Sequence, residues 1–185
     1  MTTTTTTQDL TGTYALDASH TRIGFAARHA MVTTVRGQFT ELEGLAHLDG
    51  ADPSRSTATV VIKTASLDTG NADRDAHVRG ADFLDVDTYP EIRFVSTSAE
   101  QVDEQTYRMS GDLTIKDVTR PVTVDFTYVG AVQDPWGNTR IGFEGSTKVS
   151  RKDWGLTWNV ALEAGGILVS DKVTLEFDLS AVKQP

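Results

Sequence analysis

Histidine, aspartate and glutamate are the side chains of this sequence that could bind a metal, because it contains no cysteine. The four histidines are His20, His29, His47 and His77, and no two of them stand two residues apart in a strand or four apart on a helix. An H-E-x-x-H motif is also missing. Because metal sites built on one strand or helix use such close spacing, the sequence predicts no metal site, and structural or solvent-exposed histidines instead.

The triplet Asp68-Thr69-Gly70 matches the motif that supplies one carboxylate of an aspartic protease. That chemistry needs two carboxylates that share one proton. The chain has a single D-T-G triplet, so only a symmetric dimer could complete the pair. Asp and Gly are equally typical of a turn at the end of a strand, and we interpret the triplet as such a turn.

Other common reaction chemistries lack their motifs. Without cysteine there is no disulfide and no thiolate catalysis. The sequence contains no G-x-S-x-G, no P-loop and no G-x-G-x-x-G. It therefore gives no support to a serine hydrolase, an NTPase or a dinucleotide-binding enzyme, and no cofactor is expected.

Composition points to one soluble globular domain. Its 185 residues are 38% apolar and 23% charged, which is enough for a sizeable core. The formal net charge of −9 argues against a nucleic-acid partner and against electrostatic binding to anionic membranes. Residues 1–11 are rich in threonine and are expected to be disordered, so the domain is expected to span residues 12–185.

Targeting signals are not evident in the sequence. The first residues show no basic region followed by an apolar one, and no later stretch approaches eighteen consecutive apolar residues. The sequence therefore predicts no secretory signal and no membrane insertion. We expect a cytoplasmic protein on this basis.

The longest segment without a strand pattern is residues 66–94. Any functional side chains in this segment must be positioned by its own fold. The segment holds seven acidic residues, three arginines and one histidine, together with several apolar side chains. Within it, residues 72–78 lack proline and glycine, and Asn71 is a suitable N-cap, so we predict a short helix there. We expect residues 66–90 to fold over one end of a β structure and to form its entrance, because their apolar side chains are too many for a free loop.

Apolar and polar residues alternate with period two through most of the remaining chain, which is typical of antiparallel strands. The phase of this alternation changes within residues 35–48, which predicts a bulge or a sharp bend. Residues 134–137 suit a tight turn, with proline second and glycine fourth. Many short strands indicate a sandwich or a barrel, and glycines inside the strands favour a barrel.

Short motifs follow one another in a fixed order along the chain. They are D-A-S-H (17–20), I-G-F (23–25), His29, V-R-G-Q-F (35–39), S-L-D-T-G (66–70), R-D-A-H (74–77), D-F-L-D-V (82–86), Y-P (89–90), G-D-L-T-I (111–115), V-T-R-P-V (118–122), G-F (142–143), R-K-D-W-G (151–155) and W-N (158–159). Together they resemble the YceI-like family of lipocalin-like barrels that bind polyisoprenoids, over roughly residues 12–182. Many relatives carry a secretory signal, and the polythreonine start has no counterpart in the family pattern.

The resemblance implies an all-β protein: a single antiparallel eight-stranded lipocalin-like β-barrel with a long loop and short-helix insertion. It also implies non-catalytic binding, transport or storage of a long-chain isoprenoid or similar lipid inside the barrel. By the same resemblance we expect a homodimer. An eight-stranded barrel encloses just enough space for side chains or for one slender ligand. Such a ligand would be held by burial of its apolar surface, so we expect a continuous apolar channel.

The large apolar residues that fall in phase along the strands or near the C-terminal motifs are the candidates for the lining of that channel. They are Phe25, Phe39, Ile62, Phe94, Leu113, Phe126, Phe143, Trp154 and Trp158. Each could equally be an ordinary core residue, because apolar strand residues usually are.

Basic residues could meet a phosphate or a polar head group at the barrel mouth, since arginine matches phosphate oxygens well. The candidates are Arg22, His29, Arg36, Arg74 and His77, with Arg28 beside them. Arg74 and Arg79 could instead pair with the nearby acids, and for Arg79 we favour that pairing.

Two other classes of function stay open. An enzyme acting on an isoprenoid-like substrate would need a general base near the mouth, and His77 beside Asp75 is the plausible one. A stress-response module without a ligand would have a filled interior.

Overall fold

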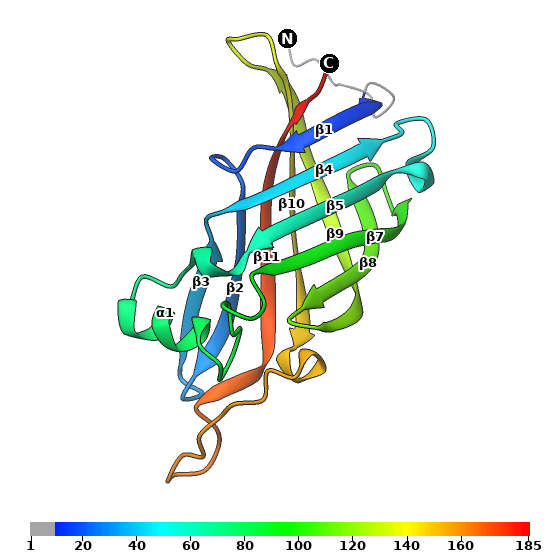
Figure 1. The fold of residues 1–185 in the computed structure, drawn as a ribbon. Coiled ribbons are helices and arrows are strands. Elements are labelled where there is room, and N and C mark those ends of the chain that lie inside the picture. The colour runs from blue at the N-terminus through cyan, green and yellow to red at the C-terminus, as the bar shows by residue number, and fades with distance from the viewer. Residues whose placement is uncertain (1–9) are drawn as a thin grey trace.

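The alternating segments build one antiparallel barrel in the computed structural model, which describes residues 10–185 (Figure 1). Around the barrel the strands follow the order β1-β4-β5-β7-β8-β9-β10-β11, and β11 pairs with β1 to close it. Their bounds are β1 Gly12–Leu16, β4 Leu42–Leu48, β5 Thr57–Lys63, β7 Glu91–Gln101, β8 Thr106–Ile115, β9 Val118–Gln133, β10 Thr139–Ser150 and β11 Val169–Lys183. The closed eight-stranded antiparallel barrel predicted from the sequence is confirmed.

The predicted disorder of residues 1–11 falls mostly outside the described residues. Leu10 is described, and its side chain is buried against Tyr14 and Ile141 at one end of the barrel. The ordered wall begins with β1 at Gly12–Leu16.

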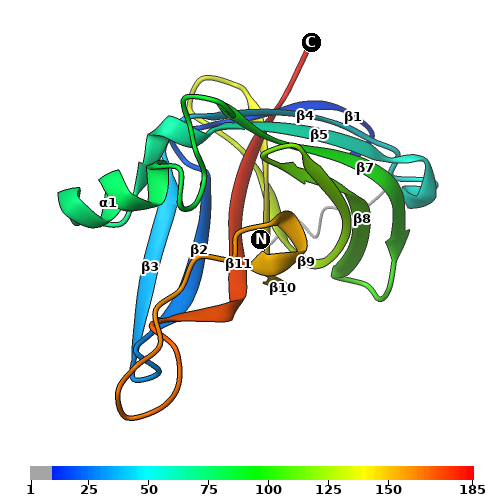
Figure 2. The ribbon, with the colours of Figure 1, turned by 60° about the horizontal axis from the view of Figure 1, so that its bottom comes forward.

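Three further strands extend the wall beyond the closed ring. They are β2 (Arg22–His29), β3 (Thr33–Phe39) and the two-residue β6 (Leu67–Asp68). Residues 169–178 of β11 pair with β2, and residues 181–183 pair with β1. Strands β1 and β2 therefore lie one after the other along the same edge of β11, with a break between them. β3 and β4 are broken in the same way, which confirms the predicted bend within residues 35–48. In Figure 2, β2 and β3 run away from β5 and β7, with α1 on the far side of β3.

Helix α1 spans Ala72–Arg79 and confirms the predicted helix. The side chain of Asn71 caps it by accepting a hydrogen bond from the backbone N–H of Arg74, at 3.0 Å. Asp73 and Asp75 lie in the first turn, where the positive end of the helix dipole favours acids. Among residues 10–185, no helix is long and apolar enough to span a membrane.

The segment that carries α1 is fixed by a buried apolar cluster. Leu67, Phe83 and Leu84 are buried there together with Leu156 from the loop before β11. Val78, Val86, Phe25 and Trp158 pack around them. The expectation that the loop's apolar residues anchor it at one end of the barrel is therefore confirmed.

Two turns take the geometry that their residues predict. The N–H of Gly137 donates to the carbonyl of Asp134, 3.0 Å away, in the turn between β9 and β10. The Asp68 carboxylate accepts a hydrogen bond from the N–H of Gly70 at 2.8 Å, and Gly70 has φ +78°. Glycine suits that left-handed backbone, so the D-T-G triplet is a strand-end turn.

Candidate functional site: an apolar cavity and its mouth

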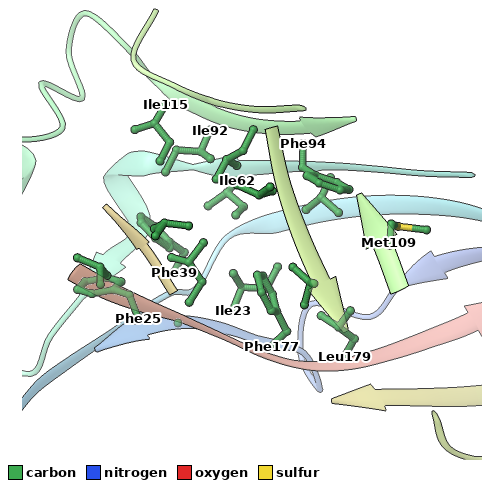
Figure 3. A pocket seen from close by; sticks show the side chains of 18 of the residues that line it. Ile23, Phe25, Phe39, Ile62, Ile92, Phe94, Met109, Ile115, Phe177 and Leu179 are labelled. Atoms are coloured by element: carbon green, nitrogen blue, oxygen red, sulfur yellow. The ribbon is translucent and has the colours of Figure 1, made fainter. Parts of the chain in front are cut away.

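The interior of the barrel is hollow. A cavity of about 860 Å³ runs between the inward-facing side chains (Figure 3). All nine apolar residues proposed from the sequence lie on its wall: Phe25, Phe39, Ile62, Phe94, Leu113, Phe126, Phe143, Trp154 and Trp158. The position of the seven that lie on strands agrees with the strand alternation, whereas Trp154 and Trp158 lie between β10 and β11. Contact of the nine with a ligand stays a prediction.

These nine residues fall into two groups by exposure. Ile62, Leu113 and Trp154 are buried, and the Trp154 indole N–H donates to the Leu113 carbonyl at 2.9 Å. They therefore serve the core as well as the cavity wall. The other six are half-buried, because part of each ring or indole faces the open interior.

Glycines on neighbouring strands explain why so many aromatic rings leave the interior open. Phe25 on β2 is paired with Gly37 on β3, and a Cβ atom on Gly37 would overlap the ring of Phe25. A Cβ atom on Gly111 would overlap the ring of Phe94 in the same way. Each of these two rings therefore uses the space over a glycine of the neighbouring strand, which leaves more of the lumen open.

Three aromatic side chains meet at the mouth. The imidazole of His77 on α1 lies 5.2 Å from the ring of Phe83 and 4.5 Å from the indole of Trp158, measured between centroids. Phe83 and Trp158 are 5.4 Å apart. Nε2 of His77 also lies 2.9 Å from the Asp82 carboxylate. The mouth is thus bounded by the α1 segment and by the loop that precedes β11.

The basic residues proposed for the mouth divide into two sets. His29, Arg74 and His77 lie on the cavity wall, and so does Arg28. Arg22 and Arg36 are not among the residues of that wall. Their neighbours Ile23, Val35 and Gly37 face inward, so strand alternation turns both arginines outward. Arg36 is exposed and lies 4.0 Å from Glu176.

Arg74 and Arg79 donate their hydrogen bonds to hydroxyl and carbonyl oxygens and not to carboxylates. Arg74 donates to the hydroxyl and to the carbonyl of Thr69, each at 2.8 Å. Arg79 donates to the carbonyl of Leu67. Neither forms an ion pair among the described residues, so the favoured pairing of Arg79 with nearby acids is wrong as a direct contact. Both charges still act on Asp75 at longer range.

Asp75 is a buried carboxylate whose role the sequence analysis missed. It accepts hydrogen bonds from the backbone N–H of Thr69 at 2.8 Å and from the Thr69 hydroxyl at 2.5 Å. These bonds, the one from the hydroxyl first, lower the pKa of Asp75. The supposed dyad of His77 with Asp75 is therefore not formed, because His77 pairs with Asp82 instead. The signal in the sequence for the role of Asp75 was its position one helical turn after the N-cap residue Asn71.

Arg151 is a second residue that the sequence analysis missed. Its side chain is 5% exposed and lies on the cavity wall. The guanidinium donates to the carbonyls of Leu156, Trp158 and Ser170, at 2.6, 2.9 and 2.9 Å. Burial lowers its pKa, and the charge of Asp171 acts against that shift. Arg151 thereby holds both ends of the loop that carries Trp158. The only sign of this residue in the sequence was its place in the R-K-D-W-G motif.

The histidines are dispersed. His20 lies 2.8 Å from Asp17, and His47 lies 2.8 Å from the hydroxyl of Thr13. His77 is at the mouth with Asp82. Within the part of the chain that the structure describes, no three His, Asp or Glu side chains gather as metal ligands.

A closed antiparallel barrel around an apolar cavity is the architecture of small barrels that can hold one ligand. The comparison with known protein families agrees with this class of small ligand-holding barrels. Residues 14–181 match the YceI-like domain, and the chain belongs to this family.

Relatives and solved structures support the assignment. A UPF0312 protein of Ectopseudomonas mendocina is 38% identical over 152 residues, covering 81% of this chain and 80% of the relative. One from Pseudomonas putida is 36% identical and covers 96% and 90%. The YCEI protein of Campylobacter jejuni superimposes with a TM-score of 0.74 at 27% identity, over 85% and 90% of the two chains. BcnA of Burkholderia cenocepacia shares the fold, with a TM-score of 0.76 at 24% identity over 89% and 98%.

Proposed function

We propose that this protein binds a long-chain isoprenoid or a similar lipid in its barrel cavity and carries or stores it without chemical change. The observation that carries this proposal is the apolar cavity of about 860 Å³. A volume of this size is within the range of pockets that enclose small ligands. A domain from Saccharophagus degradans with the same fold, at a TM-score of 0.67 and 17% identity over 92% of this chain and 98% of that domain, is described as polyisoprenoid-binding, which supports the ligand class.

The cavity wall suits a flexible hydrocarbon better than a polar molecule. Phe25, Phe94 and Phe126 lie on the cavity wall together with Ile92 and Leu179. Each methylene removed from water contributes about 0.8 kcal/mol. A long chain therefore gains affinity with each unit that fits inside, and affinity stops rising when the lumen is full.

The contacts at the mouth favour binding over catalysis. A general base needs a free lone pair within reach of substrate. Asp75 is buried, accepts hydrogen bonds from Thr69 and is not among the residues of the cavity wall, while His77 pairs with Asp82 and packs against Trp158. The same hollow interior speaks against a stress-response module without a ligand, since that alternative expects a filled barrel.

We further propose that the protein forms a homodimer. The support is exposed apolar surface on the β9–β10 hairpin, which projects beyond the barrel in Figure 1. Val129, Val132 and Trp136 on this hairpin are 61%, 62% and 80% exposed. Light scattering at high micromolar concentration tests this, and a monomer there would refute it.

Native mass spectrometry of protein purified without detergent is the test of the ligand proposal. We expect an additional mass that organic solvent removes and that behaves as an apolar molecule. Val60→Trp places an indole on the cavity wall, whereas Val95→Trp on the neighbouring strand points away from it, since Val95 is 45% exposed. The first variant should lose the additional mass and the second should keep it. Equal retention by both would place the ligand elsewhere.

A further inference from the structure

The turn between β2 and β3 displays apolar side chains on a strained backbone. Ala30 and Met31 have φ of +49° and +63°, values that favour glycine or asparagine. Met31 is 62% exposed and Val32 is 75% exposed. The turn thus carries both a backbone cost and an exposure cost that an Asn-Gly sequence would avoid, which points to a use for these side chains.

A second loop packs against this turn. The carbonyl of Leu168 accepts a hydrogen bond from the N–H of Ala30 at 2.7 Å. The side chain of Met31 lies over Gly166, where an added Cβ would come within 2.7 Å of its sulfur atom. Figures 1 and 2 both show the two loops together at one end of the molecule. Residues 28–34 and 158–168 therefore form one projection, which we name the mouth tip.

The mouth tip differs from the rest of the protein in charge. Its ionisable residues are Arg28, His29 and Glu163, so its formal charge is +1 − 1 = 0 with histidine neutral. The whole chain carries −9 by the same count. Apart from these three residues the tip is built largely from apolar and small side chains, with Val160 46% exposed. An electrically neutral, apolar surface stands out against an acidic protein.

The mouth tip also borders the cavity. His29 and Thr33 are paired across β2 and β3, are exposed to solvent and yet lie on the cavity wall, so the cavity reaches the surface at this end of the two strands. Trp158 and Leu168 of the second loop belong to the same wall. Apolar surface therefore continues from the tip into the lumen.

We propose that the mouth tip docks on a neutral lipid bilayer and that the isoprenoid passes between bilayer and cavity at this point. This inference rests on the proposed function. A long isoprenoid is held by membranes and not by water, so its carrier must meet a bilayer to load or release it. Met31 and Val32 insert among the lipids, and the rest of the acidic protein stays in water. Docking is driven by apolar burial, so it requires no basic patch.

Flotation with phosphatidylcholine vesicles tests the docking. The triple variant Ala30→Asn, Met31→Gly, Val32→Ser removes the exposed apolar side chains and gives the turn the residues that its backbone favours. Its melting temperature should equal or exceed that of the wild type, which separates lost docking from lost folding. We expect vesicle association to fall about tenfold or more, because the apolar area of two side chains is lost. Val95→Ser, on the barrel wall, is the matched control and should float as the wild type does.

Two further measurements, one with a changed vesicle composition and one with farnesol in solution, separate docking from ligand binding. Replacing part of the phosphatidylcholine by anionic phosphatidylglycerol should weaken association, because the protein is acidic. Farnesol binding in the absence of vesicles, followed by the intrinsic tryptophan fluorescence, should be unchanged in the triple variant. Wild-type protein that binds farnesol but does not float would overturn the docking while leaving the proposed function standing. Wild-type protein that binds neither farnesol nor longer isoprenoids would overturn the proposed function itself. A change from dimer to monomer in the triple variant would reassign the tip to a second copy of the chain and overturn the docking.

Discussion

The imidazole of His77 stands edge-on to the indole of Trp158, with centroids 4.5 Å apart and ring planes at 90°. This contact joins α1 to the loop before β11, two segments that are far apart in the sequence. Phe83 packs against both rings. The mouth of the cavity is therefore a small aromatic cluster, and its strength should control how readily a ligand escapes.

Phe83→Ala should loosen this cluster. Phe83 is 9% exposed, and truncating a buried phenylalanine costs about 3–5 kcal/mol of unfolding free energy. Urea unfolding measures the loss, and the rate of farnesol release should rise with it. If neither stability nor ligand retention changes, the 66–90 segment is only a surface excursion and does not cover the cavity.

His77→Ala should have a smaller effect on stability. Both His77 and Asp82 are about half exposed, and such surface pairs contribute at most about 1 kcal/mol. The loss of the Trp158 contact should nevertheless speed ligand release. His77→Phe keeps an aromatic ring against Trp158 but cannot hydrogen-bond to Asp82, so it should retain slow release. Fast release in both variants would assign the effect to the hydrogen bond instead.

Strand alternation was sufficient to place the seven lining residues that lie on strands, because a barrel strand has only two faces, but it does not apply to Trp154 and Trp158. The same alternation turns Arg22 and Arg36 outward, although both are basic residues that had been proposed for the mouth. The Asn71 cap located α1 for a similarly local reason. Features that depend on neighbouring residues in the sequence can therefore be predicted from it.

Contacts between aperiodic segments could not be read in the same way. The loop that carries Trp158 has no repeating pattern, so nothing in the sequence brings it to His77. The burial of Arg151 depends on carbonyls that face it only after that loop has closed. Asp75 is two residues from His77 on the same helix, where side chains do not face each other. The contact of His77 with Asp82, five residues further on, forms only because the chain turns back after α1.

Acid should destabilise the β9–β10 hairpin through Arg140, which bridges Asp17 at 2.6 Å and Asp134 at 3.0 Å. Hydrogen bonds from Ser19, Arg140 and His20, in that order, hold the pKa of Asp17 well below its usual range. Burial raises the pKa of Asp134, but hydrogen bonds, including that from Arg140, outweigh it and lower the pKa to about 2.

Both carboxyls have lower pKa values in the folded protein than in the unfolded chain. Their stabilisation is therefore present above about pH 4 and is lost as the pH falls toward 2. Arg140→Gln should lower the melting temperature at pH 7, and the difference from the wild type should narrow at pH 3. Thermal melts across this range measure it. A gap that widens in acid would show that Arg140 does not act through these carboxyls.

Tyr14→Phe should be tolerated. The Tyr14 hydroxyl is buried and has no hydrogen-bond partner among the described residues, so its removal leaves no group unpaired. Burial raises the pKa of Tyr14 above 10. Below pH 10 the hydroxyl is neutral in the folded and in the unfolded chain, whereas above pH 10 it ionises first in the unfolded chain, so the stability of the fold falls as the pH rises further. Unfolding at pH 8 should show equal or greater stability for the variant, which should also lose less stability than the wild type above pH 10.

Gly37→Ala tests how the cavity is kept open. An added methyl group on Gly37 would overlap the ring of Phe25 and approach Thr69 within 2.9 Å, so the ring must turn into the lumen. Overpacking of this kind costs about 1–3 kcal/mol. Gly142→Ala is the matched control, because its Cβ would meet nothing closer than 3.5 Å. Farnesol affinity should fall in the first variant and not in the second. Equal affinity in both would show that the ring of Phe25 does not limit the space available to the ligand.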